Sequence, residues 1–202
     1  MPTPAHNPSI PLLPLAGALG VAGGVCLVVD SLAVDLFGTD GAAPNSIGVL
    51  VPILGAFLVV GLFAAVRTHA PARLLDWGFA LNLVGLTLVA GVDFARTYVL
   101  SELGDDTVDA LLDSGPTKPA FLTAGVVFVV GAILFGAALL RAGFAPRASW
   151  LYVLTAAPSG FSVLLPDAVG AVAQAAAGVS VISLGWALRT APAHRTNVQP
   201  LP

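Results

Sequence analysis

Charged side chains are scarce in this sequence. Asp, Glu, Lys and Arg make up 9% of the 202 residues, with a formal net charge of −3, whereas a soluble globular domain carries about 25% charged residues. Hydrophobic residues account for 57%, and the mean hydropathy is +0.93. This composition leaves too few polar groups to cover a surface in contact with water. The sequence therefore predicts a protein whose main partner is the lipid bilayer, and it predicts no nucleic-acid partner.

Cysteine is almost absent as well. Cys26 stands alone, so an intramolecular disulfide is excluded. Val25 precedes it where lipid attachment would require a small residue. The first nine residues, MPTPAHNPS, contain no Lys or Arg, so we expect no removable signal peptide.

Catalytic and cofactor motifs are also missing. The sequence contains no P-loop, dinucleotide-binding fingerprint or zinc-protease helix. The PSG sequence around Ser159 resembles the serine site of rhomboid proteases, but Ala157 stands where those proteases have glycine, and the run 168–188 has no histidine to act as a base. We therefore expect a protein that is not an enzyme and that needs no cofactor or metal ion. The histidines all lie outside the apolar runs: His6, His69 and His194.

Apolar runs dominate what remains. Six of them approach or exceed the length of about 18 to 20 residues with which a helix crosses a hydrocarbon core of roughly 30 Å. The predicted fold is all-α, a compact bundle of six transmembrane helices in one domain at 12–189, with a disordered segment at 1–11 and a cytoplasmic tail at 190–202. The predicted spans are 12–29, 47–66, 75–97, 119–140, 149–166 and 168–188.

Three similar stretches, RTHAPAR, RAGFAPR and RTAPAHR, hold six of the eight basic residues. Lys and Arg in short loops accumulate on the cytoplasmic side of a membrane. If both termini are cytoplasmic, all three stretches lie inside and only Arg96 and Lys118 lie outside. Because the stretches have no fixed period, we interpret them as determinants of topology in the cytoplasmic membrane, not as a repeated binding motif. The six residues are Arg67, Arg73, Arg141, Arg147, Arg189 and Arg195.

A few polar residues interrupt the apolar runs. Asn82 lies within the third run, Asp93 and Arg96 lie near its outer end, and Asp30 ends the first run at the matching level. Ionisable groups at membrane depth face a partner or a water-filled cavity. One interpretation is an interfacial ion pair, because the spacing places Asp93 and Arg96 on one helix face. The other is an outward-facing vestibule in which Asp93 takes a cation or a proton.

The fifth run is short and carries Pro158 next to Ser159. Interrupted helices bind substrates near the membrane midplane in transporters, but proline also produces simple packing kinks. We favour the kink and keep the binding site as the alternative. Pro52 occupies a related place in the second run and hints at inverted three-plus-three symmetry.

Small residues recur four apart in the first and last runs. Packing inside the bundle explains this pattern, and the alternative is a seam between copies of the chain or with a membrane-protein partner. The residues are Ala16, Gly20 and Gly24 in the first run, and Gly170, Gln174 and Gly178 in the last.

The segment between the third and fourth runs is acidic. A short surface helix there would align Asp105, Asp109 and Asp113. We expect a solvated cap on the bundle and not a calcium site, since the spacing of a calcium-binding loop is missing.

The stretch GFAPRASWLYV, which enters the fifth run, and the arginine that ends the last run complete the layout. In this layout the chain resembles the small multi-pass integral membrane proteins of unknown function of high-GC actinobacteria. The resemblance implies a bacterial membrane protein and assigns no activity. From the residues, we favour a non-catalytic membrane scaffold or accessory subunit. The alternative is a small-solute or ion permease that uses the polar site of the third span and the broken fifth helix.

Overall fold

The computed structural model describes residues 12–37, 47–162 and 165–191. Within these ranges 88% of the residues are helical and none forms a strand, as the predicted all-α fold requires. Six helices of 15 or more residues are joined by short connections. They are α1 (Leu12–Phe37), α3 (Leu50–Val66), α4 (Ala72–Tyr98), α6 (Thr117–Arg141), α7 (Pro146–Gly160) and α8 (Asp167–Thr190). A 3₁₀ turn, η1 (Leu100–Glu102), and a short helix, α5 (Asp105–Ser114), lie between α4 and α6.

Prolines mark where several of these helices begin. Pro71, Pro116 and Pro166 directly precede α4, α6 and α8, and Pro146 is the first residue of α7. A proline fits the first turn of a helix because the N–H that it lacks would have no partner there. The chain reaches α7 through a tight turn in which Gly143 and Ala145 have positive φ angles of 70° and 39°.

Four helices are long and apolar enough to cross a membrane, at 12–32, 72–102, 117–141 and 168–190 of the described residues. The shorter α3 is also apolar, with 17 residues. The predicted fifth span, 149–166, differs from the structure, because α7 begins at Pro146 and ends at Gly160 after 15 residues. At 1.5 Å per residue α7 is about 22 Å long. Six crossings therefore remain a prediction.

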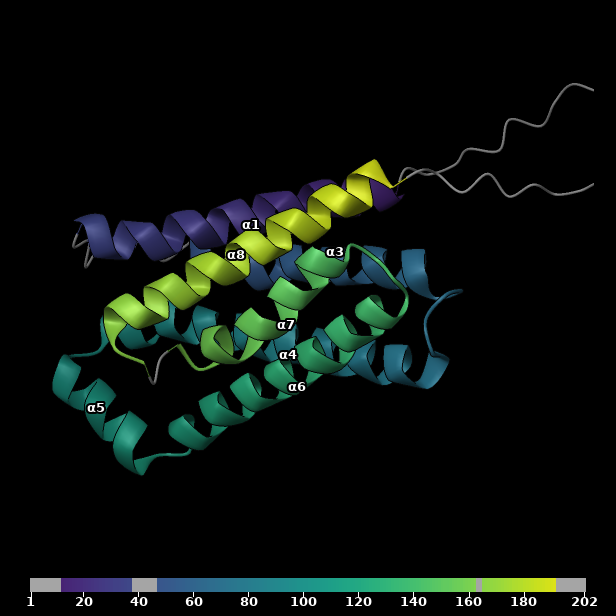
Figure 1. Ribbon diagram of the computed structural model, residues 1–202. Coiled ribbons are helices and arrows are strands. Elements are labelled where there is room, and N and C mark those ends of the chain that lie inside the picture. The colour runs from purple at the N-terminus through teal and green to yellow at the C-terminus, as the bar shows by residue number, and fades with distance from the viewer. Residues whose placement is uncertain (1–11, 38–46, 163–164, 192–202) are drawn as a thin grey trace, which may run out of the picture.

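The six long helices form a closed ring. Each helix packs against the next in the order α1, α3, α4, α6, α7 and α8, and α8 closes the ring against α1 (Figure 1). Neighbouring helices run in opposite directions, so every connection lies at one of two ends. We call them the basic end, where the helix ends carry Arg67, Arg73, Arg141, Arg147 and Arg189, and the acidic end, where Asp30, Asp93 and α5 lie.

The order of helix lengths repeats once around this ring. The first three helices are long, short and long (α1, α3, α4), and so are the last three (α6, α7, α8). The two prolines that suggested this symmetry do not correspond, however. Pro52 is the third residue of α3, whereas Pro158 is the third residue from the end of α7. Both lie toward the acidic end, so they mark one end of the bundle and not equivalent positions of two repeats.

Two seams of the ring depend on glycine. Between α1 and α8, a Cβ atom at Gly17 would lie 2.7 Å from the carbonyl oxygen of Gly185, and one at Gly24 would lie 2.6 Å from that of Gly178. Between α4 and α6, a Cβ atom at Gly78 would lie 2.6 Å from the backbone nitrogen of Phe135. Close approach of backbones is how helices associate where lipid provides no hydrophobic drive.

The predicted small-residue faces therefore pack within the chain. Ala16 contacts Gly61, Gly20 contacts Leu58, and Gly24 contacts Gly178. On α8, Gly170 contacts Ser162. Most of the small residues of the pattern are therefore in contact with other helices of the same molecule. Gln174 lines the central cavity instead.

Apolar side chains fill the basic half of the ring. Phe135 and Leu139 of α6 are fully buried and belong to one cluster with residues of every other long helix. The outside of the ring is apolar too, with Leu154 and Val172 65% and 69% exposed. The most deeply buried leucines of the cluster are Leu62, Leu75, Leu139, Leu184 and Leu188. The acidic half, in contrast, encloses a cavity, which is the candidate site.

Candidate functional site

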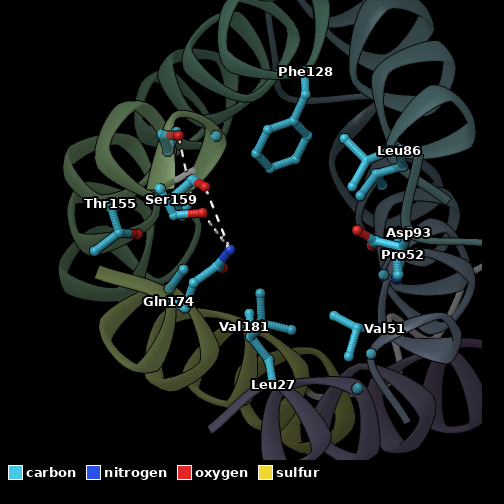
Figure 2. Close-up of a pocket in the computed structure, with 18 of the residues that line it drawn as sticks. Leu27, Val51, Pro52, Leu86, Asp93, Phe128, Thr155, Ser159, Gln174 and Val181 are labelled. Carbon is cyan, nitrogen blue, oxygen red and sulfur yellow. Dashed lines mark hydrogen bonds between the residues drawn. The ribbon is translucent and has the colours of Figure 1, made fainter. Parts of the chain in front are cut away.

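A cavity of about 590 Å³ lies in the centre of the helix ring. All six long helices contribute to its wall (Figure 2). It extends from the acidic end, where Arg96 is exposed, to a floor formed by Leu62, Phe135 and Leu184. A cavity of this size is in the range that holds small-molecule ligands.

One wall of the cavity carries charge. Asp30 of α1 and Asp93 and Arg96 of α4 all line it, and the carboxylate of Asp93 points into the open space (Figure 2). The structure thus brings three of the predicted site residues together. No direct hydrogen bond or close ion pair joins Asp93 and Arg96 in the described part of the chain, although the charge of Arg96 still acts on Asp93.

One carboxylate oxygen of Asp30 is buried without a hydrogen-bond partner among the described residues, and the other lies beside the backbone at Gly48. Its Oδ1 atom is buried and has no hydrogen-bond partner among the described residues. Its Oδ2 atom faces the start of the α3 segment, where a Cβ atom at Gly48 would lie 3.3 Å away. Glycine at position 48 therefore lets the backbone approach this carboxylate closely.

The opposite wall is polar but uncharged. Gln174 of α8 donates through Nε2 to the Ser162 hydroxyl oxygen at 2.9 Å and to the Ser159 carbonyl oxygen at 3.4 Å (Figure 2). These bonds tie α8 to the end of α7. The hydroxyl of Ser159 donates to the carbonyl of Ala156 at 3.2 Å, and that of Thr155 donates to the carbonyl of Leu151 at 2.8 Å.

Pro158 has a different place from the one predicted. It lies in the last turn of α7, which ends two residues later at Gly160, so the helix is terminated there and not broken in its middle. Pro158 is absent from the cavity wall, whereas its neighbour Ser159 lines it. Gln174 adds a side-chain donor to the Ser159 carbonyl of this last turn, which also accepts from the backbone N–H of Phe161.

Asn82 lies below the cavity and not in its wall. It is fully buried, and its Nδ2 atom donates to the Tyr152 hydroxyl oxygen at 2.7 Å. Its Oδ1 atom has no hydrogen-bond partner within the described residues. Tyr152 lines the cavity, so Asn82 acts on the site by holding that side chain. The prediction that Asn82 shares one polar site with Asp93 is corrected in this respect.

Three residues of the site were not predicted in this role. Gln174 stood in the small-residue pattern of α8, Tyr152 was not singled out, and Phe128 of α6 was treated as part of an apolar span. All three line the cavity. The signal available for Gln174 was its amide, because it is the only long polar side chain within the apolar run 168–188.

The arginines that were predicted to set the topology lie away from the cavity. Arg67, Arg73, Arg141, Arg147 and Arg189 are exposed at the basic end, and Arg195 lies outside the described residues.

The acidic segment forms the predicted short helix, α5. The side chains of Asp105, Asp109 and Asp113 lie outside the described part of the structure. Among the described residues, no three His, Cys, Asp or Glu side chains gather where they could hold a metal ion.

The fold and the apolar helices define the class of the protein. It is a helical protein with several helices of membrane-spanning length and composition, which indicates a membrane location. The chain matches no protein family model, and it has no significant match among curated proteins or solved structures.

Proposed function

We propose that this protein is a small-solute permease of the cytoplasmic membrane, with its central cavity as the solute site. One observation carries the proposal: Asp30, Asp93, Arg96 and Ser159, from three different helices, line a single cavity. Intramembrane ionisable residues face water-filled paths when they do not face a partner. If these four residues had faced separate neighbours, a non-catalytic membrane scaffold would have been favoured instead.

The membrane boundaries fit this proposal. The side chains of Trp77, Trp150 and Trp186 are all exposed, at 56% to 67%, close to the basic end. Phe94 and Tyr98 are exposed near the acidic end, with ring centroids 5.0 Å apart. Aromatic belts of this kind lie at membrane–water interfaces. On α4, Trp77 and Tyr98 are separated by about 31 Å, which matches a hydrocarbon core of roughly 30 Å.

The arginines give the orientation that we propose. The basic end faces the cytoplasm with both termini, and the acidic end faces outward. Six crossings then follow, with α3 and α7 as the two short ones. The cavity reaches the outer side, and the apolar cluster around Phe135 closes the cytoplasmic side. Transport would require a second state in which this cluster separates.

A purely structural role explains the cavity less well. Protein interiors are packed to the density of organic crystals, and an unfilled volume costs stability. The walls around Asp93 and Gln174 are polar, so this volume can hold water. A scaffold would need neither the volume nor its charged wall.

We propose no catalytic role for Ser159. The Ser159 hydroxyl donates to a carbonyl of its own helix, and His69 lies at the basic end, beyond the cavity floor. Without a base beside it, a serine hydroxyl is a weak nucleophile.

Solute flux tests the permease directly. Proteoliposomes containing the full chain are shrunk in solutions of methylammonium, glycerol or glycine, and their re-swelling is followed by light scattering. We expect faster re-swelling than in empty liposomes for at least one solute. Gly55→Phe should abolish the difference, since Gly55 lines the cavity and has only ordinary contacts around it.

The matched control is Gly91→Phe on α4. Gly91 is exposed, and nothing lies within 4 Å of the Cβ position there, so the added ring enters lipid. Equal re-swelling of Gly55→Phe and unsubstituted protein, or no flux of any solute, would contradict the permease.

A further inference from the structure

The positive and negative charges of the ionisable side chains in the cavity wall do not cancel. Among the described residues, the wall contains the two carboxylates of Asp30 and Asp93 and the single guanidinium of Arg96. With all three charged, the sum is one negative charge. An uncompensated charge below the surface of a membrane protein is costly, so the arrangement is stable when a positive charge enters the cavity.

The hydrogen bonds of this wall also lack a donor. The Oδ1 atom of Asp30 is buried and has no partner in the described ranges. The neighbouring hydroxyl of Ser31 donates to the carbonyl of Leu27 in its own helix at 2.6 Å, and so is committed elsewhere. A ligand that brings both a positive charge and N–H donors would compensate the charge of Asp30 and donate to the carboxylate of Asp93, which points into the cavity.

The rest of the cavity is shaped for an apolar body. The ring of Phe128 projects into the open space (Figure 2), and Leu27, Val51, Leu86 and Val181 also line the cavity. An aromatic face attracts ammonium groups as well as apolar groups. An inorganic ion would leave most of the volume of about 590 Å³ unfilled.

We propose that the cavity binds a monovalent organic ammonium ion with an apolar body, its ammonium group between Asp30 and Asp93 and its body against Phe128. This proposal rests on the permease proposed above and names the class of its solute. A calcium ion fits less well, because it takes six to eight oxygen ligands and two carboxylates provide at most four. Anions are disfavoured by the net negative charge of the wall.

Three probes of similar size and different charge test the ligand class. Isothermal titration of the purified full chain in detergent is carried out with benzylammonium, benzyl alcohol and benzoate. We expect benzylammonium to bind with a Kd lower by about tenfold or more than that of either other probe. Asp30→Asn and Asp93→Asn should each raise this Kd by about tenfold or more. Asp76→Asn, at an exposed position near the basic end of the same helix α4, should leave it unchanged.

Arg96→Gln separates a charge effect from a structural one. It raises the net negative charge of the wall, so benzylammonium should bind about threefold tighter or better. A residue that only supports the fold would weaken binding when replaced. If an asparagine variant fails to fold, Asp93→Glu, which keeps the charge, and Arg96→Gln decide the outcome. Asp93→Glu should bind within about threefold of the unsubstituted protein.

The proposal is overturned by any of four results. These are equal binding of benzoate or benzyl alcohol, unchanged binding in the asparagine variants, weaker binding in Arg96→Gln, and no binding of any probe. A flux that Gly55→Phe abolishes and Asp93→Asn leaves intact would overturn the ligand class and preserve the permease. Binding of benzylammonium without flux of any solute would overturn the permease and preserve the ligand class.

Discussion

Asn82 and Tyr152, 70 positions apart in the chain, are joined by a hydrogen bond of 2.7 Å from the amide nitrogen to the phenol oxygen. The bond crosses the ring from α4 to α7, beneath the cavity and within the apolar half. This polar contact links α4 to α7 next to a cluster of hydrophobic side chains. The Asn82 Oδ1 atom is buried and has no partner among the described residues.

This pair predicts non-additive stability changes. Tyr152→Phe leaves the buried Asn82 amide without its acceptor, which should lower the free energy of unfolding by about 1–3 kcal/mol. Asn82→Leu should also destabilise, but the double variant should lose less than the sum of the two single variants. The measurement is denaturation of the three variants in detergent. Strict additivity would mean that the two side chains do not interact.

The glycine seam between α4 and α6 predicts a second contrast. Gly78→Ala places a Cβ atom 2.6 Å from the backbone nitrogen of Phe135, and the required shift should cost about 1–3 kcal/mol of stability. Gly91→Ala on the same helix meets nothing within 4 Å and should be neutral or stabilise by up to about 1 kcal/mol. Thermal unfolding of both variants compares them. Equal melting temperatures would contradict the close approach of the two backbones.

Helix positions could be predicted from the sequence, because apolar runs and prolines are local signals. The end of α7 could not, since Pro158 is equally compatible with a kink and with termination, and only the structure shows that the helix ends two residues later at Gly160. That Asp30 and Asp93 line the same cavity could not be predicted without knowing how the ring closes. The spacing of Asp93 and Arg96 correctly indicated a shared helix face, but that face borders a cavity, so the two side chains need not pair.

The three exposed tryptophans are expected to lie at the depth of the lipid headgroups. In variants that keep one of Trp77, Trp150 and Trp186 and replace the other two with phenylalanine, fluorescence should be quenched more strongly by lipids labelled near the headgroup than by lipids labelled at the acyl-chain ends. All three should give a similar depth, because each lies four or five residues from the end of its helix at the basic end. Stronger quenching from the bilayer centre would contradict the proposed membrane boundary.

The orientation has its own test. In a Cys26→Ser background, Glu102→Cys at the acidic end and Thr68→Cys at the basic end replace exposed residues. An impermeant maleimide added to intact cells should label the protein with Glu102→Cys at once, and the protein with Thr68→Cys only after permeabilisation. The opposite pattern would invert the topology.

A water-filled cavity that opens outward inside an apolar bundle is the central claim, and two adjacent residues of α8 test it most directly. Ala171 lines the cavity, whereas Val172 is 69% exposed on the lipid-facing surface. In the Cys26→Ser background, a positively charged, impermeant methanethiosulfonate is added from outside to membranes containing Ala171→Cys or Val172→Cys. The account predicts rapid modification at position 171 and almost none at position 172, because thiols react as thiolates in water and not in lipid. Modification at position 172 that equals or exceeds modification at position 171 would contradict it.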